Sequence, residues 1–151
     1  MITLNDFAGA WRLSRHIEDA LAGGTARLEG YCRFTPQDDG LLCTESGTLI
    51  LPGREGGFTA ERRYFWRSDP DGIAVFFDDG RFFHRFDPNA ASPAADHDCA
   101  PDAYAVRYDF SGWPLWSAQW RVKGPRKDYV SVSQFSRRRR SPEADDRPCR
   151  D

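Results

Sequence analysis

Charged, phenolic and indole side chains alternate with ordinary residues along several stretches of the chain. We expect one set of them to share the inner face of a β structure: Arg15, Glu45, Arg62, Tyr64, Trp66, His84, Tyr104, Tyr108, Trp120, Tyr129 and Ser133. A guanidinium offers a fork of N–H donors that matches a carboxylate. These residues predict a binding site for a small anionic or aromatic ligand.

Glu45 and Arg62 form the polar centre of this expected site. The segment PGREGG predicts a hairpin turn centred near residues 53 and 54, so positions whose numbers sum to about 107 lie opposite each other. Because an unpaired interior guanidinium is costly, we expect Arg62 to hold the ligand's charge, with Glu45 as its orienting neighbour. Alternatively, the two residues only neutralise each other within a packed core.

His84 is the only histidine within a strongly patterned strand. It is either a hydrogen-bonded core residue, which is the commonest case, or a general base, or a haem ligand. Spacing alone assembles no triad of a serine, His84 and an acid, so catalytic residues are not assigned. An enzyme of isomerase or cyclase type, with Glu45 as base and Tyr64 or Tyr108 as acid, is an alternative to a binding protein.

Metal and nucleotide chemistry are disfavoured. The four cysteines include no C-x-x-C pair, which favours free thiols. His97, Asp98 and Cys99 are consecutive, and three consecutive ligands rarely meet tetrahedral geometry alone. The chain also has no G-x-G-x-x-G, P-loop or H-E-x-x-H motif. We therefore expect no metal and no cofactor.

The elements that would position these residues are short strands. Period-two alternation predicts about eight to ten of them, in stretches such as 26–36, 41–51, 58–67 and 104–110, with one helical turn at residues 4–7. Asp79-Gly80 predicts a type I′ turn that pairs Phe77 with Phe82 and Val75 with His84. The fold class is all-β, a single antiparallel barrel, because closure hides the edge strands.

Composition favours one folded domain over residues 1–137, followed by a flexible Arg-rich tail at 138–151. The 151 residues are 14% aromatic and carry a net charge of −2, which favours neither nucleic acid nor an anionic membrane as a partner. We expect a small-molecule ligand as partner and a cytoplasmic location, with the oligomeric state undetermined. A third function class is an interaction module that uses the outer face or the tail.

Two motifs carry a family resemblance. The opening Phe7-Ala8-Gly9-Ala10-Trp11, with Gly-x-Trp at the start of the first strand and Arg137 at the end of the last, resembles the signature of calycin barrels, the lipocalin and fatty-acid-binding superfamily. In those barrels the Trp closes one end and the late Arg packs across its indole. The resemblance implies a calycin-like barrel whose interior Arg and Tyr side chains hold a carboxylate. It also keeps open a haem barrel of the nitrobindin type, with His84 as the axial ligand.

A longer likeness covers about residues 4–137. The segments 62–66, 79–81, 83–87 and 124–129 resemble a family of small bacterial proteins catalogued as a domain of unknown function. This resemblance implies the fold and no particular activity.

Overall fold

A computed structural model describes residues 1–137 as one 3-10 turn followed by ten strands. The elements are η1 (Leu4–Phe7), β1 (Gly9–Asp19), β2 (Gly24–Gln37), β3 (Gly40–Ile50), β4 (Phe58–Asp69), β5 (Gly72–Phe77), β6 (Phe82–Phe86), β7 (Ala94–Cys99), β8 (Asp102–Gly112), β9 (Leu115–Gly124) and β10 (Lys127–Arg137). The expected all-β class and the helical turn at residues 4–7 are confirmed.

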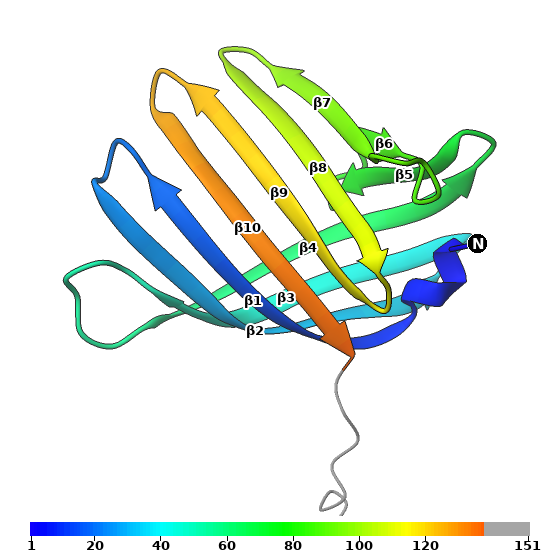
Figure 1. Cartoon of the computed structure of the whole chain (residues 1–151), viewed down its shortest axis with the longest axis horizontal. Coiled ribbons are helices and arrows are strands. Elements are labelled where there is room, and N and C mark those ends of the chain that lie inside the picture. Colours follow the sequence, from blue (N-terminus) through cyan, green and yellow to red (C-terminus); the bar gives the residue numbers. More distant parts are fainter. Residues whose placement is uncertain (138–151) are drawn as a thin grey trace, which may run out of the picture.

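The strands form one antiparallel sheet that curls into a nearly closed barrel. Their order is β6-β5-β4-β3-β2-β1-β10-β9-β8-β7, and Figure 1 shows β8, β9, β10 and β1 crossing in front of β2, β3 and β4. Side chains bridge the two ends of the sheet, because the His97 ring of β7 lies 5.2 Å from the Phe83 ring of β6 and 6.0 Å from that of Phe77. These contacts close the barrel wall between its two edge strands.

Alternation places one face of each strand inside the barrel. In β1, Trp11 and Leu13 are buried while Arg12 is exposed. Gly30 of β2 lies opposite Gly47 of β3, and a Cβ on Gly30 would collide with the neighbouring backbone. The pair of glycines therefore allows β2 and β3 to approach where the sheet bends.

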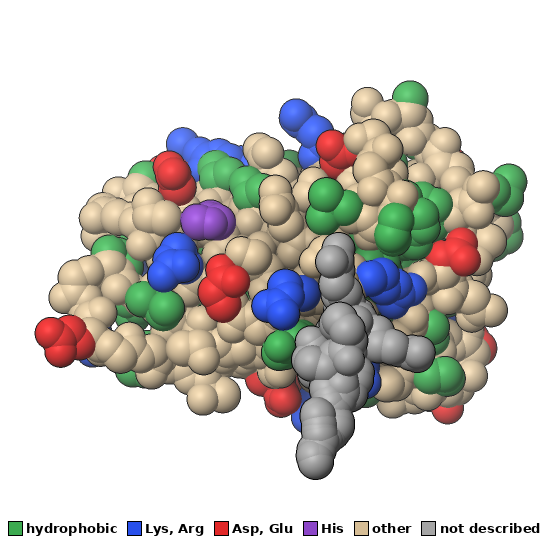
Figure 2. Space-filling model, turned by 60° about the horizontal axis from the view of Figure 1, so that its bottom comes forward, with side chains coloured by type: hydrophobic (Ala, Val, Ile, Leu, Met, Phe, Trp, Pro, Cys, Tyr) green, Lys and Arg blue, Asp and Glu red, His purple; other side chains and the backbone are tan. Residues whose placement is uncertain are grey.

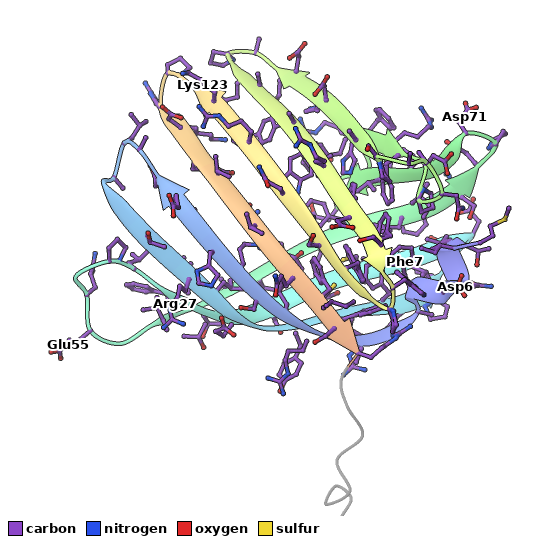
Figure 3. All side chains as sticks on the ribbon, viewed as in Figure 1. Asp6, Phe7, Arg27, Glu55, Asp71 and Lys123 are labelled. Atoms are coloured by element: carbon purple, nitrogen blue, oxygen red, sulfur yellow. The ribbon has the colours of Figure 1, made fainter. Side chains whose placement is uncertain are left out.

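The short turn η1 closes one end of the barrel. Phe7 is fully buried, and Figure 3 shows it pointing inward from η1 while Asp6 points away. Its ring lies 5.0–6.4 Å from six other aromatic rings: Trp11, Phe34, Trp66, Phe110, Trp113 and Trp116. This end of the barrel is filled by packed side chains.

Arg137 holds this closed end together. Its guanidinium carbon lies 3.8 Å from the centre of the Trp11 ring, while Nη1 and Nη2 donate hydrogen bonds to the carbonyls of Ala8 and Asp6 at 3.0 and 2.7 Å. The Trp11 indole N–H donates to the carbonyl of Phe7 at 2.8 Å. The predicted contact between Arg137 and Trp11 is confirmed.

The hairpin between β5 and β6 differs from the predicted two-residue turn. Gly80 has a φ of 94° while Asp79 does not have a positive φ, so the turn is not type I′. The Phe77 carbonyl accepts from the Gly80 N–H at 2.9 Å, and the Phe77 N–H donates to the Arg81 carbonyl at 2.8 Å. The loop therefore has three residues, one more than the predicted two-residue turn. Val75 still pairs with His84, but Phe82 pairs with Phe76 instead of Phe77.

Charges of both signs intermix on the outside. On the part of the face in Figure 2 that the described residues form, Lys and Arg side chains lie among Asp and Glu side chains. Within residues 1–137 no helix is long and apolar enough to cross a membrane. The expected Arg-rich tail, residues 138–151, lies outside the described residues.

Candidate functional site

The barrel encloses a cavity of about 280 Å³. All eleven residues predicted to bind a ligand line it: Arg15, Glu45, Arg62, Tyr64, Trp66, His84, Tyr104, Tyr108, Trp120, Tyr129 and Ser133. They come from seven strands, so the closure of the sheet brings them together. Whether they bind a ligand stays a prediction.

The cavity opens at the end of the barrel opposite to Phe7. Arg62 and Lys127 both line the cavity and are both exposed, which places them at its opening. Lys127 begins β10, whereas Arg137 ends β10 at the closed end. The deep wall consists of buried side chains, among them Phe34 and Trp116. A ligand would therefore enter past Arg62 and place its far end among aromatic rings.

Some lining residues were not singled out from the sequence. Ser131 shares the parity of Tyr129 and Ser133, so alternation could have found it. Phe83 could not be found in that way, because Phe83 and His84 are both buried although they are consecutive. The irregular register between β5 and β6 accompanies this break in alternation.

Glu45 makes its ion pair with Arg15, not with Arg62 as predicted. Register is as expected, since Glu45 and Arg62 are cross-strand partners. However, Arg15 Nη2 donates to both carboxylate oxygens of Glu45 at 2.9 and 3.0 Å, and Arg15 Nε donates to Ser133 Oγ at 2.6 Å. Both charged side chains are only 11% exposed, and their charges cancel inside the wall.

Arg62 is therefore the cation at the opening that is not held in an ion pair within the described residues. Among residues 1–137 it forms no ion pair, whereas Lys127 is paired with Asp102 at 3.3 Å. Withdrawal from water acts to lower the pKa of Arg62, but nearby Tyr64 and Glu45 outweigh this and raise it. A stable cation next to a phenol can bind an anionic group through charge-assisted hydrogen bonds.

His84 and Tyr108 form a hydrogen-bonded pair in the buried part of the wall. His84 Nε2 lies 2.8 Å from the Tyr108 hydroxyl, and the two residues are 3% and 5% exposed. Burial first, and then the proximity of His97, lower the pKa of His84 to about 3. The imidazole is therefore neutral at physiological pH, and axial ligation of a haem through Nε2 would require breaking the bond to Tyr108.

Cys32 and Cys43 lie side by side in the same wall. Their sulfur atoms are 3.5 Å apart, both residues are buried, and burial raises the pKa of Cys43. A protonated, buried thiol is a poor nucleophile, so this pair is suited to packing. Within residues 1–137 no three His, Cys, Asp or Glu side chains are grouped to hold a metal ion.

The antiparallel ten-strand sheet, the plug at Phe7 and the contact between Arg137 and Trp11 define a calycin-like barrel. The chain belongs to the family of unknown function DUF6314, whose model matches residues 7–137. The comparison with curated proteins finds no match.

A solved structure supports the same fold. The chain is similar to the S-type phycobiliprotein lyase CPES from Guillardia theta, with a TM-score of 0.65 and 12% sequence identity. The match covers 93% of this chain and 95% of the lyase. At this identity the likeness establishes the barrel fold and not a shared substrate.

The ion pair of Arg15 and Glu45 gives a first prediction. Arg15→Met or Glu45→Gln alone should lower the free energy of unfolding by about 3 kcal/mol, because each leaves a buried charge unpaired. The double variant should lose less than the sum of the two. Urea denaturation measures all three proteins.

The matched control is the cycle of Arg62→Met with Glu45→Gln. Arg62 is the cross-strand partner of Glu45 and feels its charge without being its ion-pair partner, so the coupling energy in this cycle should be smaller than that between Arg15 and Glu45. Additive effects for Arg15 and Glu45, with coupling for Arg62 and Glu45, would contradict the assignment of the ion pair.

His84 gives a prediction on pH dependence. The pKa of His84 is about 3 in the folded protein, against 6.5 ordinarily, so below pH 6.5 the unfolded chain binds the extra proton. Stability from His84 is thus present above pH 6.5 and lost as the pH falls toward 3. Between pH 6.5 and 5 the wild type should lose about 1.5 kcal/mol more than His84→Gln in denaturant titrations. Equal losses in both proteins would show that His84 is not held neutral.

Proposed function

We propose that this protein binds a small anionic aromatic molecule inside its barrel, with the anionic group at Arg62. The observation that carries the proposal is a cavity of about 280 Å³ whose opening holds an arginine without a carboxylate partner among residues 1–137. Net positive charge at the entrance of a cavity that is partly walled by aromatic rings favours a ligand with one negative group. Small-molecule sites are typically concave and mostly apolar, with a few polar groups that fix orientation.

The aromatic side chains of the cavity wall support an aromatic ligand. Phe83 stacks on Trp120 with ring centres 5.0 Å apart and an interplanar angle of 11°, and on Phe77 at 4.4 Å and 21°. Trp120 and Phe77 are partly exposed, so this stack reaches toward the opening. A flat ring system entering past Arg62 would pack against it with favourable offset-stacked or edge-to-face geometry.

The alternatives have less support. Glu45 is a weak candidate for a general base, because both of its carboxylate oxygens accept from Arg15. An interaction module that uses the Arg-rich tail rests on residues outside the described part of the chain. The name of the similar lyase concerns phycobiliproteins, and its 12% identity brings no substrate to this chain. A cytoplasmic location and the lack of nucleic-acid and membrane partners stay predictions.

Binding of the fluorescent anion 8-anilinonaphthalene-1-sulfonate tests the proposal. The probe has an aromatic body and one sulfonate, so the wild type should bind it with enhanced fluorescence and a raised melting temperature. Arg62→Met should weaken binding at least about tenfold, because one charge-assisted hydrogen bond contributes roughly 1.5–3 kcal/mol.

Arg63→Met is the matched control. Arg63 neighbours Arg62 on β4 but faces outward, where it contacts Glu61 at 3.3 Å. This variant should bind the probe within twofold of the wild type. Binding that Arg62→Met and Arg63→Met alter equally, or a wild type that does not bind the probe, would contradict the proposal.

A further inference from the structure

The hydrogen-bonded pair of His84 and Tyr108 has a feature that the proposed function does not use. His84 is buried in the cavity wall, with 3% of the residue exposed, and among residues 1–137 its Nδ1 has no hydrogen-bond partner. Buried polar atoms without partners are uncommon and call for a physical reason. The reason follows from where the imidazole proton lies.

Two arrangements of the pair are possible for a neutral imidazole. In one, Tyr108 donates to Nε2 and the proton lies on Nδ1, where it would be a buried N–H without an acceptor. In the other, Nε2–H donates to the Tyr108 oxygen, and Nδ1 keeps only a lone pair. Each arrangement leaves one donor without a partner in the protein, the Nδ1–H in the first and the Tyr108 O–H in the second. The Nδ1–H is fixed in the plane of the buried ring, whereas the hydroxyl hydrogen can rotate toward the cavity that Tyr108 lines and be satisfied there. The second arrangement is therefore favoured.

In this arrangement the Tyr108 hydroxyl hydrogen points away from His84. Once the Tyr108 oxygen accepts from His84, its own O–H is free to donate elsewhere. Within residues 1–137 Tyr108 has no hydrogen-bond partner besides His84, and Tyr108 lines the cavity. Burial raises the pKa of Tyr108, so the phenol keeps its proton. The deep wall thus holds a neutral O–H donor without an acceptor.

Aromatic rings pack around this donor. The Phe86 ring stacks on Tyr108 with centres 4.1 Å apart, and the Trp120 ring lies 5.1 Å from that of His84. A hydrogen bond made there by a ligand would be shielded from water. A ligand group that offers an oxygen acceptor would satisfy the donor, whereas a hydrocarbon group would leave it unpaired.

We propose that the Tyr108 hydroxyl, positioned by His84, donates a hydrogen bond to a carbonyl or other neutral oxygen of the bound ligand. This inference rests on the proposed function and narrows the ligand class. The ligand is an aromatic acid with its anionic group at Arg62 and a neutral oxygen acceptor at its far end. Tyr108 is then a specificity residue, and His84 acts through Tyr108 by donating to its oxygen.

Two pairs of synthetic acids test this class by exchanging one oxygen for a CH₂ group. The shorter pair is 4-acetylbenzoate and 4-isopropenylbenzoate, and the longer pair is 6-acetyl-2-naphthoate and 6-isopropenyl-2-naphthoate. Isothermal titration calorimetry measures their dissociation constants. In at least one pair the wild type should bind the ketone about tenfold or more tightly than the alkene, because only the ketone accepts from Tyr108.

Substitutions at Tyr108 and His84 test whether these two residues cause the preference for the ketone. Tyr108→Phe should bind ketone and alkene equally, while Arg62→Met should weaken both without changing their ratio. His84→Leu should reduce the preference, and His84→Gln should restore most of it, because an amide N–H can also donate to the Tyr108 oxygen. A loss of packing alone would affect ketone and alkene alike.

The outcomes separate this inference from the proposed function. Equal binding of ketone and alkene by the wild type at both lengths would overturn the role of Tyr108 and leave the anionic site at Arg62 standing. A preference that survives in Tyr108→Phe would also overturn it. Failure of all four acids to bind would count against both proposals. The comparison in the wild type does not depend on the folding of any variant.

Discussion

The packing of Phe7 at the closed end of the barrel is the interaction on which the rest of the structure depends. Its fully buried ring packs against six aromatic rings. These rings belong to β1, β2, β4, β8, β9 and the turn that joins β8 to β9. Arg137 fixes η1 through the carbonyls of Ala8 and Asp6 while it covers Trp11. Because this end is filled, the interior is accessible from the opposite end, and a cavity with one opening results.

Within that cavity, the balance of charge depends on Arg15, whose side chain extends past β2 to Glu45. Arg15 lies on β1 and Glu45 on β3, with β2 between them. The inward position of β2 between Leu28 and Cys32 is Gly30, which has no side chain to obstruct Arg15. The ion pair of Arg15 and Glu45 is internally neutral, and this leaves Arg62 as the cation available to a ligand.

Local alternation was sufficient to predict the all-β fold and the inward direction of the predicted site residues other than His84, because side chains along a strand alternate between two faces. It also predicted that Glu45 lies opposite Arg62. It could not predict the ion pair of Glu45, since register describes neighbouring strands and Arg15 reaches across β2. Nor could it predict the pairing of Phe82 with Phe76, which depends on one extra residue in the loop at Gly80.

The central claim is that the cavity holds a small anionic molecule at Arg62. Native mass spectrometry of the full chain, purified from its own cells under gentle conditions, tests it most directly. The account predicts a complex heavier than the chain by the mass of one small acid, with the added mass lost in Arg62→Met and retained in Arg63→Met. A wild-type protein that carries no added mass, and to which no aromatic acid binds when supplied, would contradict it.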